Sequence, residues 1–82
     1  MTINLLLFGA CREAASGQSE LNLETTAAAD VQTVWDALIG QYPALVQFSS
    51  NVLFAVNEEY APRTRVLAAG DTLAIFPPVS GG

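Results

Sequence analysis

The sequence contains no histidine and no lysine, and its one cysteine is Cys11. A single cysteine cannot form a disulfide within the chain, and without histidine a Cys/His zinc site lacks its ligands. The same absences remove the Cys–His and Ser–His pairs on which conventional hydrolases depend. We therefore expect no metal site and no catalytic set of side chains, and we expect Cys11 to be a small apolar residue of the core.

Positive charge is scarce, because three arginines stand against eight Asp and Glu residues and give a net charge of −5. Nucleic acid binding needs clustered basic residues, and Arg12 is far in sequence from Arg63 and Arg65. We therefore expect no nucleic acid ligand. For most acidic proteins such a charge serves only solubility, and the alternative is a basic protein partner.

Long hydrophobic runs are also missing, since no apolar stretch approaches the roughly 18 residues that cross a membrane. Residues 1–8 have a short apolar run but no positively charged region before it, so we expect no signal peptide. These features predict no membrane contact and favour the reducing cytoplasm as the location.

What is present is enough for one small folded domain. The chain has 82 residues, of which 51% are hydrophobic and 13% charged. This composition is too apolar for an intrinsically disordered chain, and the length leaves no room for a second core. We expect a β domain with helices over residues 1–76 and an extended, flexible tail over residues 77–82.

Hydrophobic patterns predict four strands. Residues 2–8 are apolar on both faces, which is typical of a central strand. Residues 19–25 alternate leucine with polar residues, which predicts a half-exposed strand that pairs with the first. Two further strands are expected at 52–57 and 72–76.

Two helices are expected between these strands. Residues 9–17 hold good helix formers and end at a glycine that can take a left-handed cap. A longer helix begins after the N-cap residue Asp30 and ends at Pro43. Its apolar residues form one stripe: Val31, Val34, Trp35, Leu38, Ile39 and Tyr42. The order β, short α, β, α, β, β predicts an α+β fold of the ubiquitin-like β-grasp type, with a mixed sheet packed on one main helix.

The last residues are Phe76, Pro77, Pro78, Val79, Ser80, Gly81 and Gly82. Two prolines impose an extended path and remove two backbone donors, so this segment can continue neither a helix nor a central strand. Small residues follow, and glycine carries no side chain, so the terminal carboxylate could enter a narrow channel. The alternative is a frayed end, because termini are commonly disordered.

These motifs resemble the MoaD-type sulfur carriers, the family of small subunits of molybdopterin synthase. The resemblance rests on residues 8–13 after the first strand, on residues 55–57 with Tyr60, and on residues 69–82. It covers the whole chain, and an ending of Phe-Pro-Pro-Val-Ser-Gly-Gly is far more specific than Gly-Gly alone. Thiamine-type sulfur carriers share the Gly-Gly but generally lack the two prolines.

The resemblance implies a sulfur-transfer cycle. A ubiquitin-activating-like adenylyltransferase would use ATP to adenylate the carboxylate of Gly82, and sulfur would then replace AMP to give a thiocarboxylate. The tail, residues Pro77, Pro78, Val79, Ser80 and Gly81 with Gly82, would thread into the large synthase subunit, in a heterotetramer of two small and two large subunits. No cofactor would be bound permanently, and most catalytic side chains would lie on the large subunit.

Other functions remain open at this point. The chain could be a ubiquitin-like modifier that joins Gly82 to protein lysines, a thiamine-type carrier, or a passive β-grasp adaptor. The missing lysine fits an activated acyl group protected from internal amines, but arginine-for-lysine drift in a GC-rich genome gives the same result and is the interpretation that we favour.

A partner-binding face is expected beside the tail. Strand alternation turns Leu73 and Ile75 inward and therefore Phe76 outward. The family resemblance implies that Phe8, Tyr60 and Phe76 contact both the large subunit and the activating enzyme, and that Arg12 contacts the activating enzyme. The alternative is that Phe8 and Phe76 only pack on each other at the edge of the domain.

Overall fold

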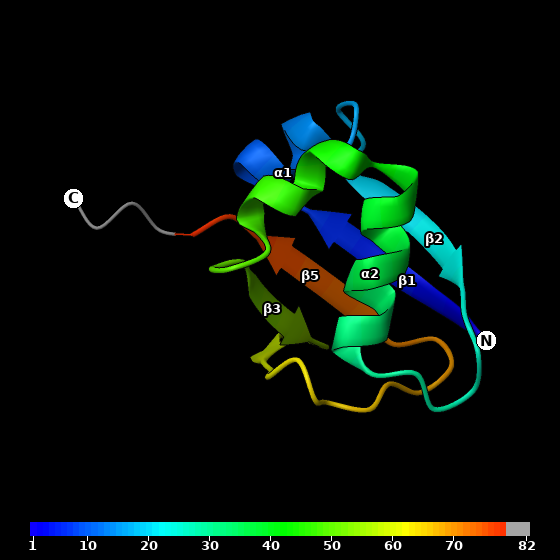
Figure 1. The fold of residues 1–82 in the computed structure, drawn as a ribbon. Helices are drawn as coiled ribbons and strands as arrows, with labels where there is room; N and C mark the ends of the chain where they lie inside the picture. The colour runs from blue at the N-terminus through cyan, green and yellow to red at the C-terminus, as the bar shows by residue number, and fades with distance from the viewer. Residues whose placement is uncertain (79–82) are drawn as a thin grey trace.

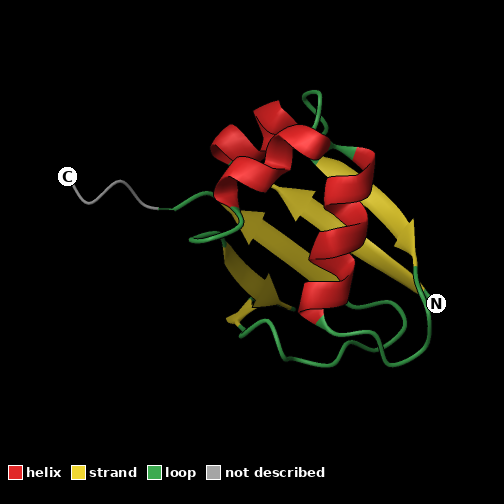
Figure 2. Cartoon of the chain, in the orientation of Figure 1, coloured by secondary structure: helices red, strands yellow, loops and turns green. Residues whose placement is uncertain are grey.

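The computed structural model describes residues 1–78, which form a five-stranded mixed sheet in the order β2-β1-β5-β3-β4. The helices lie together against one face of this sheet, so the domain has two layers (Figure 2). This is the α+β β-grasp arrangement that the sequence predicts. In chain order the elements are β1 (Thr2–Leu7), α1 (Gly9–Ala14), β2 (Glu20–Glu24), α2 (Val31–Gln41), the 3-10 helix η1 (Pro43–Phe48), β3 (Leu53–Val56), β4 (Glu59–Tyr60) and β5 (Thr72–Phe76).

The first strand occupies the interior of the sheet, as its two apolar faces predict. It pairs antiparallel with β2, where Leu5 lies opposite Leu21, and parallel with β5, where Leu5 lies opposite Leu73. Figure 1 shows α2 crossing this part of the sheet, with α1 near the end toward which β1 runs. Within the described residues, the outer face of β1 and β5 carries no helix (Figure 2).

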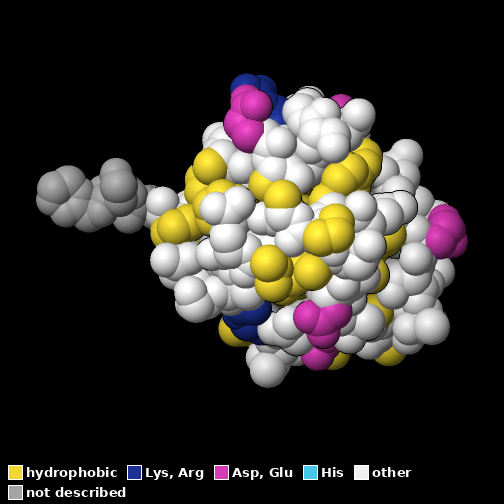
Figure 3. Space-filling view, turned by 45° about the horizontal axis from the view of Figure 1, so that its top comes forward, with side chains coloured by type: hydrophobic (Ala, Val, Ile, Leu, Met, Phe, Trp, Pro, Cys, Tyr) yellow, Lys and Arg dark blue, Asp and Glu magenta, His cyan; other side chains and the backbone are white. Residues whose placement is uncertain are grey.

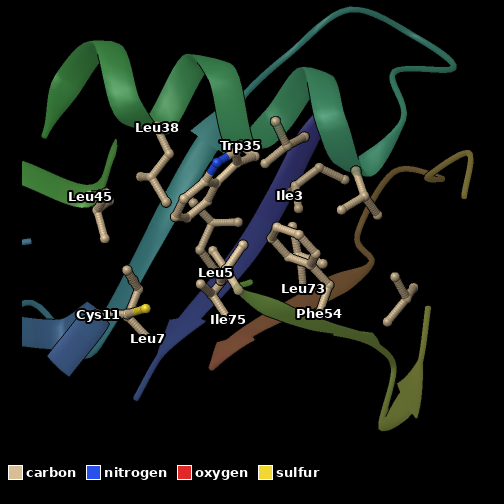
Figure 4. Packing of buried hydrophobic residues seen from close by; sticks show 14 of the residues in the cluster. Ile3, Leu5, Leu7, Cys11, Trp35, Leu38, Leu45, Phe54, Leu73 and Ile75 are labelled. Atoms are coloured by element: carbon tan, nitrogen blue, oxygen red, sulfur yellow. The ribbon is translucent and has the colours of Figure 1, made fainter. Parts of the chain in front are cut away.

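The core lies between α2 and the inner face of the sheet. Trp35 is fully buried and meets the ring of Phe54 edge-on, with ring centroids 5.6 Å apart (Figure 4). The indole N–H of Trp35 donates a 3.1 Å hydrogen bond to Ser49 Oγ, which satisfies its polar group. Cys11 is completely buried in the same cluster, as expected for a small apolar residue.

Local signals explain where α2 begins and ends. The Asp30 side chain accepts a hydrogen bond from the Thr33 backbone N–H at 2.8 Å, which caps the helix at the expected residue. Pro43 ends α2, but the expectation of a simple stop was incomplete, because Pro43 also begins η1. Proline is well suited to the first turn of a helix, where its missing N–H would have no partner.

A fifth strand, β4, adds to the four strands that the sequence predicts, because the chain turns back after Val56 instead of leaving the sheet there. Val56 pairs with Glu59, and Asn57 and Glu58 form the two-residue turn between them with φ values of 49° and 73°. Turns of this kind join antiparallel strands tightly. The usual glycine is absent from this turn, which is why the hairpin was missed.

The irregular segment before β5 is held by Arg63. Its guanidinium donates to Gln32 Oε1 at 3.0 Å and to the Ser49 carbonyl, and it lies over the Phe54 ring at 5.5 Å. Arg63 therefore ties this segment to α2, to the end of η1 and to β3.

None of the helices within residues 1–78 has the length and apolar character needed to span a membrane. On the side of the molecule seen in Figure 3, hydrophobic side chains lie in several separate groups, with backbone and other side chains between them. The large cluster of apolar side chains is the buried core.

Candidate partner-binding groove and tail exit

The outer face of the sheet carries a groove of about 620 Å³. One row of paired residues crosses it from strand to strand: Leu6 lies opposite Ala74, Ala74 opposite Ala55, and Ala55 opposite Tyr60. The two alanines in the middle are small and the outer residues are large, so the row is hollow at its centre. Among residues 1–78 the lining consists of Leu6, Phe8, Ala55, Asn57, Glu58, Tyr60, Thr72, Ala74 and Phe76.

Three of the residues predicted from the sequence to bind a partner lie together at this groove. Phe8 and Phe76 stack with centroids 4.7 Å apart and planes 6° apart, and Tyr60 tilts against Phe76 at 6.4 Å. Phe8 nevertheless exposes 42% of its surface and Tyr60 exposes 78%, while Phe76 is half-buried. Phe8 therefore packs on Phe76, and the aromatic residues still leave exposed surface that a partner could contact.

Arg12, the fourth predicted residue, is not part of the groove lining. It lies exposed on α1, and its guanidinium is 3.8 Å from the Glu13 carboxylate. An exposed ion pair between adjacent residues contributes little to stability, so Arg12 stays accessible to a partner.

The tail leaves the sheet beside Phe8. The Phe8 backbone N–H donates to the Ile75 carbonyl at 3.1 Å, and Gly9 has a φ of +53°. A Cβ atom at Gly9 would lie 3.1 Å from Pro77 Cγ, so the backbone at Gly9 packs directly on the first proline of the tail. Pro77 and Pro78 are half-buried and belong to no helix or strand. The other predicted tail residues, Val79, Ser80, Gly81 and Gly82, lie outside the described residues.

A polar network, not foreseen from the sequence, closes the other end of the groove. The Asn57 side chain donates to Asp71 Oδ1 at 3.0 Å and accepts from the Thr72 N–H at 3.0 Å. The Ala68 N–H donates to Asp71 Oδ2 at 2.8 Å, and this bond, followed by the one from Asn57, lowers the pKa of Asp71. Residues 69–71 belong to the motif over residues 69–82, but the sequence alone does not indicate that Asn57 is the partner of Asp71 across the sheet.

The groove is lined mainly by apolar side chains, and among its described lining residues Glu58 carries the one carboxylate. Burial raises the pKa of the Cys11 thiol to about 11, so the only sulfur nucleophile among the side chains is protonated and enclosed. Residues 1–78 include no group of three His, Cys, Asp or Glu residues placed to hold a metal ion.

Comparison with known proteins matches residues 5–82 to the ThiS family. The chain belongs to the ThiS family. It is 38% identical to the molybdopterin synthase sulfur carrier subunit of Arabidopsis thaliana over 98% of this chain and 82% of that protein. It is 39% identical to the protein of the same name from Mycobacterium tuberculosis, over 98% of this chain and 96% of that one.

A solved structure is also similar to this chain. The crystal structure of small archaeal modifier protein 1 from Haloferax volcanii has a TM-score of 0.85, with 34% sequence identity and complete coverage of both chains. The ubiquitin-like fold and the similarity to molybdopterin synthase sulfur carriers expected from the sequence are therefore confirmed.

Proposed function

We propose that this chain is the sulfur carrier subunit of molybdopterin synthase and that its functional C-terminus is the α-carboxylate of Gly82. The observation that carries the proposal is its identity of 38% and 39%, along nearly its whole length, to two relatives of that name. The same names favour molybdopterin synthesis over a thiamine-type role.

The chemistry resides in the terminal carboxylate, which is a poor electrophile until it is activated. The Gly82 carboxylate attacks the α-phosphate of ATP on an adenylyltransferase, which forms an acyl-adenylate and releases pyrophosphate. A sulfur nucleophile at the oxidation level of hydrosulfide then adds to the acyl carbon, and AMP leaves with the bonding electrons. The resulting thiocarboxylate is a good nucleophile towards the pterin precursor, and water restores the carboxylate by cleaving the acyl carbon–sulfur bond.

The large synthase subunit supplies the substrate site in this proposal, in a heterotetramer of two small and two large subunits. The groove supports this assignment of roles, since its described residues offer exposed aromatic side chains beside the tail exit and no catalytic group. The tail residues Pro77 to Gly82 reach into the large subunit. The small subunit needs no resident cofactor, and ATP is consumed by the activating enzyme in the cytoplasm.

A ubiquitin-like modifier is the second candidate function, and the similarity to small archaeal modifier protein 1 favours it. Both functions begin with adenylation of Gly82, but they end in different products. A carrier gives a thiocarboxylate on the free protein, whereas a modifier gives an isopeptide bond to a lysine of another protein.

Mass spectrometry of the intact protein separates these functions after co-expression with the activating enzyme. We expect the wild-type chain to gain the mass difference between sulfur and oxygen, and we expect deletion of Gly82 to abolish both this gain and sulfur transfer while the melting temperature stays unchanged. A Gly81→Ala variant should still fold but thread poorly, because a β-carbon enters a channel sized for glycine. Molybdopterin formation by the chain lacking Gly82 would contradict the proposal.

A further inference from the structure

Glu58 occupies a backbone position that suits glycine. It is the second residue of the β3–β4 turn and has a φ of 73°, after Asn57 with a φ of 49°. Asparagine tolerates this left-handed conformation, whereas glutamate has no local interaction that favours it. Two-residue turns of this kind prefer Asn-Gly, so a glycine at position 58 would fit the turn better.

The Glu58 side chain lies at the groove, where it is the one charged residue among the described lining residues. Within residues 1–78 its carboxylate takes part in no hydrogen bond or ion pair. Its neighbour Glu59 is also exposed but is not among the residues that line the groove. The fold therefore holds a free carboxylate beside an apolar hollow at a position where it gains nothing from the backbone.

We propose that Glu58 is a specificity-determining residue that pairs with a lysine or arginine of the protein partner docked in the groove. The partner presents an apolar side chain to the floor formed by Ala55 and Ala74, and places a basic group next to it. The net charge of −5 favours a basic partner surface as well. This inference rests on the proposed function, in which that partner is the large synthase subunit.

Three variants separate charge from backbone strain. Glu58→Gln removes the charge and keeps the strained turn, Glu58→Gly removes both, and Glu59→Gln removes the same charge outside the groove. Binding of each to the large subunit of the same organism is measured by surface plasmon resonance at low and high ionic strength, and melting temperatures are measured in parallel.

We expect Glu58→Gln and Glu58→Gly to associate about fivefold more slowly than wild type at low salt and to lose part of the salt dependence. Glu59→Gln should bind like wild type. The melting temperature should rise by about 4 °C in Glu58→Gly alone, so that one substitution stabilises the chain and weakens its binding.

Two results would overturn the inference. Equal association rates and salt dependence for wild type and all three variants would show that Glu58 has no role in recognition, while leaving the proposed function intact. A large subunit that fails to bind even the wild-type chain would contradict the proposed function and this inference together.

Discussion

The ring of Phe8 lies parallel to the ring of Phe76, with 4.7 Å between the centroids and 6° between the planes. One residue follows β1 and the other ends β5, so the stack joins the two parallel central strands at the point where the tail leaves. With Gly9 packed on Pro77, it fixes the position of the tail exit relative to the groove.

The stack should be measurable as a coupling energy. In a double-mutant cycle, Phe8→Ala and Phe76→Ala should be non-additive in the free energy of unfolding by about 0.5 to 1.5 kcal/mol, the range for offset aromatic pairs. Urea denaturation of the two single variants and the double variant gives the value. Additive effects would mean that the rings contribute only through their separate contacts with the sheet.

Phe76→Ala should also weaken binding to the large subunit about tenfold.

Tyr60 offers the cleaner test of the binding face, because it exposes 78% of its surface. Tyr60→Ala should weaken binding to the large subunit about tenfold and leave the melting temperature nearly unchanged, since little buried surface is lost. Val66→Ala is the matched control: Val66 is 58% exposed and lies outside the groove. Isothermal titration calorimetry decides the question, and equal affinities for both variants would remove Tyr60 from the interface.

The lowered pKa of Asp71 predicts that the folded protein loses stability in acid. Hydrogen bonds from the Ala68 N–H and the Asn57 amide lower its pKa below the ordinary value of 3.8. A carboxyl group with a lowered pKa stabilises the fold above its unfolded-state pKa, and this contribution disappears as the pH falls through the folded-state pKa. Asp71→Ala should therefore lower the melting temperature at pH 7 and progressively less below pH 3.8.

Glu20→Ala serves as the control for that experiment, because Glu20 is an exposed acid at the start of β2. Its effect on the melting temperature should be small at every pH. A difference between Asp71→Ala and wild type that stays constant from pH 7 to pH 2 would contradict the assigned role of the ionised Asp71.

Cys11 should be inert in the folded chain. The thiol is completely buried, and its pKa is raised to about 11. Ellman's reagent at pH 8 should label Cys11 only through unfolding, hence far more slowly than in guanidinium chloride. Stability should also fall as the pH rises from 9.0, the ordinary thiol pKa, through 11, because the unfolded chain loses the thiol proton first. Labelling at the same rate with and without denaturant would contradict this burial.

The regular elements with strong periodicity were predictable from the sequence, and the short ones were not. The last strand was placed at its observed residues, and α2 was correctly bounded by Asp30 and Pro43 because both residues act on the local backbone. The two-residue strand β4 and the helix η1 have no comparable local pattern. They form because tertiary contacts outweigh weak local preferences.

The groove could be predicted only in part. Phe8, Tyr60 and Phe76 were expected at a partner face, but the hollow depends on Ala55 meeting Ala74 in register across β3 and β5. No property of either alanine alone marks it as the floor of a groove. The role of Asn57 as a partner of Asp71 likewise depends on strand pairing between residues far apart in the chain.

The parallel pairing of β1 with β5 has a consequence for how the chain folds during synthesis. Leu5 finds its partner Leu73 only after nearly all of the described chain has been made, and such distant contacts are slow to form because a long loop must close first. Until β5 is in place, neither the groove nor the aromatic stack at the tail exit exists. An incomplete chain on the ribosome would therefore present no docking face to a partner, and recognition would begin only with a finished domain.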